Sequence, residues 1–101
     1  MAESIPEPVE RRPWRKSDGP EPTVWCWPNA HRPALYVWSR GKWRYGSVMA
    51  RHDYADGAVA YQVAVNLGIK DMGVTARTYG WPQPGLRVAQ RSPVKPTTSG
   101  T

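Results

Sequence analysis

The sequence predicts an all-β domain, and three observations lead to that prediction. Apolar residues alternate with small or polar residues from Val59 to Leu67, which is the period of two of a β-strand. Other runs are rich in aromatic and β-branched residues and end at Gly or Pro. No segment of ten or more residues carries the apolar stripe of a helix.

The expected strands follow one another through short connections. Gly41 with Lys42, and Asp56 with Gly57, supply tight turns. Five consecutive strands, with one extra edge strand at 23–27, would close best as a small barrel, because closure removes exposed strand edges. The five strands are expected over 34–40, 42–54, 58–67, 74–81 and 86–89.

The 101 residues suffice for one domain with a tail at each end. We expect a disordered, Pro-rich N-terminal tail over 1–22, the folded domain over 23–89 and a disordered polar tail over 90–101, because the tails have too few apolar residues to offset the entropy of ordering. The expected core consists of Leu35, Val37, Val48, Val63, Val65 and Leu67.

The charge is concentrated on the folded part of the chain. The net charge is +6, and residues 23–89 carry eight basic and three acidic side chains, a net charge of +5. Such a surface favours an acidic partner, either nucleic acid or an acidic protein patch. A charge of this size is also ordinary for the solubility of a small domain, where values of about 2–8 are common.

Several function classes are not expected from the composition. Cys26 is the single cysteine, so no internal disulfide can form, and with His31 and His52 it cannot supply a standard zinc ligand set. His52 and Asp53 are adjacent on an expected strand and should point to opposite faces, which argues against an acid–base pair. We therefore expect no enzyme activity, no metal, no cofactor and no small-molecule substrate.

The chain is expected in the cytoplasm. The segment before Arg11 has no apolar core of a signal peptide, and no run approaches the ~20 apolar residues that span a bilayer. No membrane partner is expected. Four cations surround Trp14 between Arg11 and Lys16, and this cluster could contact a phosphate backbone or could be a solvated patch of the tail.

One constellation points to binding, because basic and aromatic residues are interleaved around the second expected hairpin. Such residues suit a phosphate backbone with stacked bases. They equally suit a protein interface, or a charged edge that protects the sheet from aggregation. The candidate binding residues are Trp38, Arg40, Lys42, Trp43, Arg44, Tyr45, Arg51, Tyr54, Arg77 and Arg87.

The central 34 residues, from Ala34 to Leu67, resemble small SH3-like barrels of the Tudor and chromo-barrel type. The resemblance implies a five- or six-stranded barrel that acts as a binding module, in some cases with an aromatic cage for a methylated side chain. The composition also resembles that of small proteins from GC-rich actinobacteria and mobile elements. The residues that carry the likeness to the barrels are Gly41, Trp43, Tyr45, Gly46, Val48, Asp56, Gly57, Tyr61, Val63 and Val65.

These observations lead to an expected function, a small accessory or regulatory protein that binds nucleic acid with little sequence specificity. Trp43 would be the stacking ring. The alternative is a module that binds a protein or peptide through the same surface. We expect the phosphate contacts to come from Arg40, Lys42, Arg44 and Arg51. The aromatic residues that would form either a ligand cage or a cap on the barrel are Trp38, Trp43, Tyr45 and Tyr54.

Overall fold

The computed structural model describes residues 4–98, and the prediction of an all-β chain is confirmed. Within this range the helices are two 3₁₀ turns, η1 (Lys16–Asp18) and η2 (Asn29–His31), and none is long and apolar enough to cross a bilayer. The strands are β1 (Thr23–Cys26), β2 (Ala34–Ser39), β3 (Lys42–Asp53), β4 (Val59–Asn66), β5 (Val74–Trp81), β6 (Leu86–Gln90) and β7 (Thr97–Thr98).

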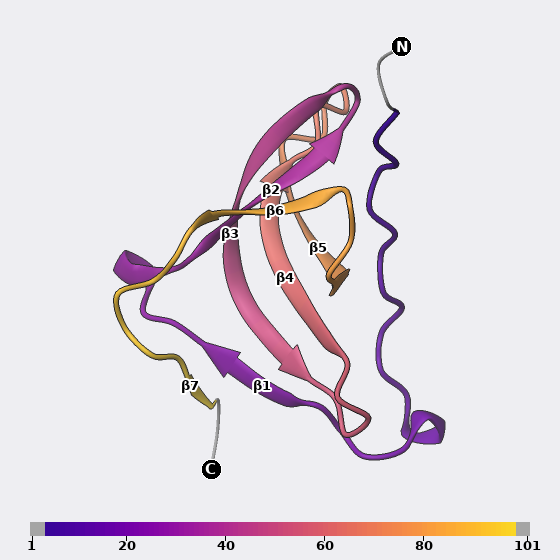
Figure 1. Ribbon diagram of the computed structural model, residues 1–101, viewed down its shortest axis with the longest axis vertical. Helices are drawn as coiled ribbons and strands as arrows, with labels where there is room; N and C mark the ends of the chain where they lie inside the picture. Colours follow the sequence, from indigo (N-terminus) through magenta and orange to yellow (C-terminus); the bar gives the residue numbers. More distant parts are fainter. Residues whose placement is uncertain (1–3, 99–101) are drawn as a thin grey trace.

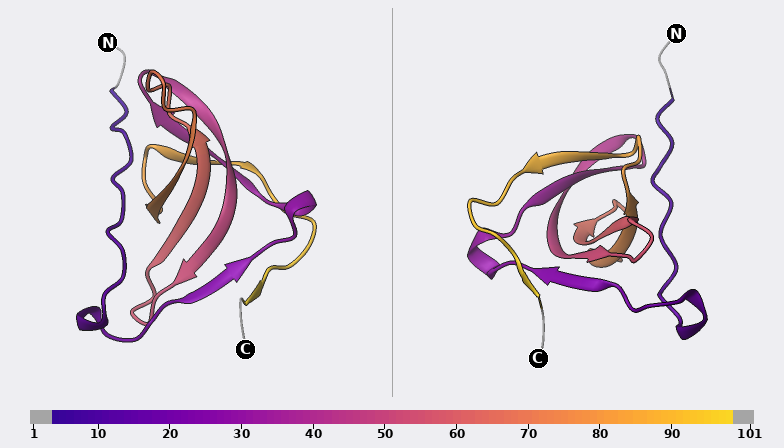
Figure 2. Two further views of the ribbon diagram at one scale, coloured as in Figure 1. Left: turned by 180° about the vertical axis from the view of Figure 1, so that it is seen from behind. Right: turned by 60° about the horizontal axis from the view of Figure 1, so that its bottom comes forward.

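All strand pairs are antiparallel, and β3 is the strand around which the sheet is organised. The first half of β3 pairs with β2 and its second half with β1, while β4 pairs along its other side. Beyond these, β5 pairs with β4, β6 with β2 and β7 with β1. Figure 1 shows the long curve of β3 and β4, and the right view of Figure 2 shows the strands curling round a common centre.

A β-bulge allows β3 to change partners. The register of β3 against β4 shifts between Val48 and Ala50, so that Met49 is the extra residue. A bulge bends its strand and increases the local twist. Beyond this bend, the stretch from Ala50 to Asp53 leaves β2 and pairs with β1.

The expected core is confirmed, because all six of its residues lie in one buried cluster, together with Tyr79 and Leu86. Val37, Val63 and Val65 are fully buried, with exposed fractions of 0%. Burying each such side chain contributes about 1.5–3 kcal/mol relative to leaving it in water. The alternation read from the sequence of β4 therefore identifies the face that packs inward.

The connection between β2 and β3 is a two-residue hairpin turn. Arg40 and Gly41 have φ angles of +51° and +76°, the left-handed values that this kind of turn requires. The predicted turn residues are thus shifted by one, because Lys42 already pairs with Ser39 as the first residue of β3. The short turn fixes the register in which the aromatic residues of β2 and β3 face each other.

Both tails make contacts with the sheet, although their predicted disorder stays a prediction. Residues 4–22 run alongside the sheet (Figure 1), and Glu10 forms an isolated bridge with Tyr79 of β5. At the other end, β7 pairs with β1 and gives the sheet seven strands, where five or six were expected. A two-residue strand has no detectable period, so the sequence pattern does not indicate it.

Gly46 lies where β3 and β4 approach closely, and its replacement tests that packing. An added Cβ would lie 2.7 Å from Val63 Cγ1 and 3.2 Å from Val65 Cβ. We expect Gly46→Ala to lower the free energy of unfolding by about 1–3 kcal/mol through overpacking. Gly80→Ala in β5 is the matched control, because nothing lies within 4 Å of its added Cβ. Equal loss in both variants, measured by urea unfolding, would contradict this account of Gly46.

Candidate binding surface

Four aromatic rings and one guanidinium gather on the outer face of β6, β2 and β3. Strand pairing places Tyr36 opposite Tyr45 and Trp38 opposite Trp43, with ring centroids 6.0 Å and 5.1 Å apart. Arg87 of β6 pairs with Tyr36, and its guanidinium carbon lies 4.2 Å from the centroid of the Trp43 ring. We call Tyr36, Trp38, Trp43, Tyr45 and Arg87 the aromatic platform.

The two tyrosines are the open part of the platform. The exposed fraction is 55% for Tyr45 and 39% for Tyr36, whereas Trp38 and Trp43 are half-buried. The Tyr45 hydroxyl donates a hydrogen bond to Oε1 of Gln90, 3.0 Å away, which holds the ring in place. Because Arg87 already lies over the Trp43 ring, the tyrosines are better placed than Trp43 to stack with a ligand.

The strands of the platform carry positive charge with almost no acid to balance it. The sequence has no Asp or Glu from Thr23 to His52 and none after Asp71. These stretches contain all of β2 and β6 and all of β3 except its last residue. A face with exposed rings and with a guanidinium that forms no ion pair among residues 4–98 suits an anionic ligand that also has flat groups.

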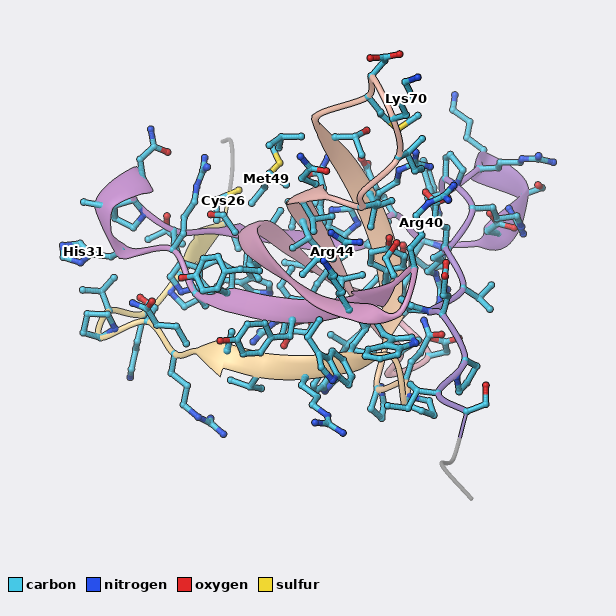
Figure 3. All side chains as sticks on the ribbon, turned by 90° about the horizontal axis from the view of Figure 1, so that it is seen from above. Cys26, His31, Arg40, Arg44, Met49 and Lys70 are labelled. Carbon is cyan, nitrogen blue, oxygen red and sulfur yellow. The ribbon has the colours of Figure 1, made fainter. Side chains whose placement is uncertain are left out.

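Lys42 and Arg44 do not join the platform, because they lie on the opposite face of β3. Arg44 pairs with Val37, whose side chain is fully buried. The Arg44 Nε donates to the carbonyl oxygen of Ser39 at 3.2 Å, and Figure 3 shows Arg44 near the middle of the curled sheet. Lys42 is exposed at the end of the same face. These two cations therefore lie away from the platform.

Arg51 is engaged in a local cluster at the far end of β3. Its Nη2 lies 3.0 Å from Oδ2 of Asp53, and its guanidinium lies 5.8 Å from the Trp25 ring centroid. The indole Nε1 of Trp25 donates to the same Asp53 oxygen at 2.9 Å. The carboxylate balances the charge of Arg51, which makes this residue a poor phosphate contact.

Arg40, Arg77 and Tyr54 all lie against the N-terminal segment. The backbone N–H of Arg40 donates to Glu7, and Arg77 forms an ion pair with Glu10. Tyr54 stacks with a guanidinium of that segment, the Arg11 carbon lying 3.8 Å from its ring centroid. Figure 3 shows Arg40 on the side of the molecule where this segment runs.

The structure thus brings together Trp38, Trp43, Tyr45 and Arg87, and places the other six predicted residues elsewhere. Sequence reasoning missed Tyr36. The signal was present, because the period of two in β2 puts Tyr36 and Trp38 on one face. The same rule separates Lys42 and Arg44 from Trp43 and Tyr45.

The ionisable groups with a perturbed pKa lie in the N-terminal segment, at the end of β3 and in β5, outside the platform. The hydrogen bond from Arg12, with one from the Arg15 backbone, lowers the pKa of Asp18 to about 2, and Asp18 in turn raises the pKa of Arg12. Burial lowers the pKa of His52. Burial, followed by the charge of Glu10, raises the pKa of Tyr79.

The described residues offer little for metal or nucleophilic chemistry. Among residues 4–98, no three His, Cys, Asp or Glu side chains come close enough to hold a metal ion. Cys26 is a half-buried free thiol in β1, and Figure 3 shows His31 at the outer edge of the molecule on η2. The platform is the candidate functional site because of its exposed rings and the guanidinium beside them.

The comparisons with known proteins do not narrow the function further. A comparison with known protein families, with curated proteins and with solved structures found no match. The chemistry of the platform is consequently the basis on which a function can be argued.

Proposed function

We propose that the protein is a small non-enzymatic binding module that associates with single-stranded nucleic acid through the aromatic platform, as an accessory or regulatory protein. The observation that carries the proposal is the exposure of Tyr36 and Tyr45 beside Arg87, on strands without acidic residues apart from the end of β3. Catalytic turnover, a metal and a cofactor are no part of this function, and we place it in the cytoplasm.

Single strands fit the platform better than duplexes. Unpaired bases can stack on exposed rings, and each such stack contributes about 1–3 kcal/mol. The exposed rings of Tyr36 and Tyr45 lie on neighbouring strands with their centroids 6.0 Å apart, so neighbouring bases can each meet a ring. In a duplex the base faces are already stacked on each other, which leaves only phosphate contacts with Arg87.

The second candidate is a module that binds a protein or peptide. An apolar groove of about 280 Å³ lies on the face of β2 and β6 opposite the platform, next to the C-terminal segment. Trp27, Leu35, Val88 and Val94 are among the residues that line it. Trp, Tyr and Arg are also the residues that dominate protein interfaces. This observation favours a peptide ligand that inserts an apolar side chain.

The strand order supports the further proposal that the fold is an SH3-like barrel. In that arrangement a meander of four strands is followed by a last strand that returns to the first. Here β2, β3, β4 and β5 pair in succession and β6 pairs back on β2. The mobility of both tails belongs to the same proposal, and backbone relaxation measurements on the full chain would test it.

Arg87 provides the sharpest test of the nucleic-acid proposal. Arg87→Ala should weaken binding of a fluorescently labelled single strand, and should reduce the slope of log K against log salt by about 0.7, the loss of one phosphate contact. The matched control is Lys70→Ala, which removes the same charge from the exposed turn after β4. Anisotropy titrations at several salt concentrations measure both quantities. If the two substitutions changed the affinity and the salt slope equally, the proposal that Arg87 contacts the nucleic acid would be wrong.

A further inference from the structure

Residues 6–11, which we call the N-terminal strap, continue the sheet beyond β5. Glu10 forms an antiparallel bridge with Tyr79, and the backbone N–H of Arg11 donates to the Thr78 carbonyl oxygen at 2.8 Å. Without the strap, this side of β5 would be an open strand edge. An open edge is a template that pairs with any extended chain of suitable sequence.

A side-chain amide extends this pairing by one residue. Gln83 Nε2 donates to the Val9 carbonyl oxygen at 2.9 Å, and the Val9 backbone N–H donates to Gln83 Oε1, also at 2.9 Å. The amide thus bonds both backbone groups of one residue, as a neighbouring strand would. The Val9 side chain is 73% exposed, so the site recognises the backbone at this position.

Two carboxylates of the strap meet donors on the barrel. Glu10 Oε2 lies 3.1 Å from Arg77 Nη1, and Glu7 Oε2 accepts from the Arg40 backbone N–H at 2.9 Å. The Arg77 side chain is 25% exposed, and its Nε is buried without a hydrogen-bond partner. A carboxylate nearby stabilises such a partly buried guanidinium, since an uncompensated charge at this site is costly.

A close contact with Gly85 restricts the shape of the segment that can bind here. An ideal Cβ built on Gly85 would lie 2.7 Å from the Pro6 carbonyl oxygen and 2.7 Å from Pro8 Cδ. The strap therefore lies directly on the Gly85 backbone, which leaves room only for a flat, extended segment. Strand edge, amide, guanidinium and glycine together recognise an extended chain with carboxylates three residues apart.

We propose that the outer edge of β5, with Gln83, Arg77 and Gly85, is a docking site for an extended acidic peptide of a partner protein. The strap is the occupant that the chain itself supplies. Its contacts are mainly polar and its hydrogen-bonding atoms are mostly exposed, so it belongs to the part of the molecule that opens at low cost. A peptide that adds as a strand can then take its place. This site is separate from the aromatic platform and does not depend on its function.

Charge reversal on the full-length chain tests the proposal. In Glu10→Arg, the chain's own strap is repelled by Arg77, which frees the edge. A labelled peptide with the sequence of residues 4–12 should bind this variant, and a peptide with Arg in place of Glu10 should bind about tenfold more weakly or less. In Arg77→Glu the preference should reverse. Lys70→Glu, combined with Glu10→Arg, is the control and should keep the preference for the acidic peptide.

Three results would overturn the proposal. The acidic peptide could fail to bind the Glu10→Arg variant at millimolar concentration, or the two peptides could bind it equally well. A mixture of the Glu10→Arg and Arg77→Glu chains could also run at twice the 11.4 kDa of one chain in light scattering, which would make a second copy the occupant. The Glu10→Arg/Arg77→Glu double variant restores the ion pair within one chain. Its amide spectrum shows whether the Arg77 substitution leaves the fold intact.

Discussion

Replacing Val65 with Asp should unfold the domain. The Val65 side chain is fully buried in the core, opposite Gly46 of β3 and Thr75 of β5. Neither residue can pair with a carboxylate as a cation would, so the charge would be buried or the strand displaced. The cost is several kcal/mol, a large part of the about 5–15 kcal/mol that stabilises a typical domain. We expect a collapsed amide spectrum and no cooperative thermal transition.

Val74→Asp is the matched control for that substitution. Val74 also lies in a strand, at the start of β5, but its side chain is 69% exposed. The same change there should alter the free energy of unfolding by only about 0.5 kcal/mol. If Val65→Asp unfolded cooperatively, with a midpoint close to that of the control, the described core could not be correct.

Tyr45→Ala should give the largest loss of binding on the platform. Its ring is the most exposed of the four, and the hydrogen bond to Gln90 keeps it oriented before a ligand arrives. Removing one stacking ring should weaken single-strand binding by about 1–3 kcal/mol, or roughly 5- to 150-fold. Trp43→Ala should affect binding through Arg87, because the substitution removes the ring against which the Arg87 guanidinium lies. Anisotropy with a labelled single strand measures both effects.

Two variants show whether the lost ring itself is responsible. Tyr45→Phe keeps the ring and removes only the hydroxyl that bonds Gln90, so most of the affinity should remain. Tyr54→Ala removes a ring outside the platform, where Arg11 stacks on it, and should leave the affinity unchanged. A loss in Tyr54→Ala as large as that in Tyr45→Ala would move the binding surface to the N-terminal segment.

The local pattern of the sequence was sufficient for strands β1 to β6 and for the core. β4 shows why: its alternating residues place Val63 and Val65 on the buried face, and burial on that face is what holds the register. The bounds of β5, from Val74 to Trp81, also agree with the run between its Gly and Pro neighbours. In both cases the same residues determine the local conformation and the packing.

The candidate site was less predictable, because it depends on which strands meet. Arg87 joins the platform only through the pairing of β6 with β2, a contact between distant parts of the chain. Lys42 and Arg44 are neighbours of Trp43 in sequence, but the alternation of β3 places them on the other face. Residues that are neighbours in the sequence were therefore predicted to form one site, although the sheet places these cations and rings on opposite faces.

The contacts of the N-terminal segment could not be predicted for a related reason. The residues of the strap have little apolar surface, and the partners of Glu10 and Val9 lie 67 and 74 positions away. The bulge at Met49 likewise has no marker in the sequence, although it decides where β3 turns from β2 toward β1. Such features depend on the assembled sheet and not on local propensity.

Binding of nucleic acid to the aromatic platform is tested most directly by a chemical-shift titration of the chain. The ligands are a short single strand and a short duplex of the same sequence, at about 50 mM salt, where phosphate contacts are strong. We expect the single strand to perturb the amides of β2, β6 and the first half of β3, centred on Tyr36, Tyr45 and Arg87, and the duplex to have a smaller effect. If neither ligand perturbed these residues at this salt concentration, the aromatic platform would not be a nucleic-acid site.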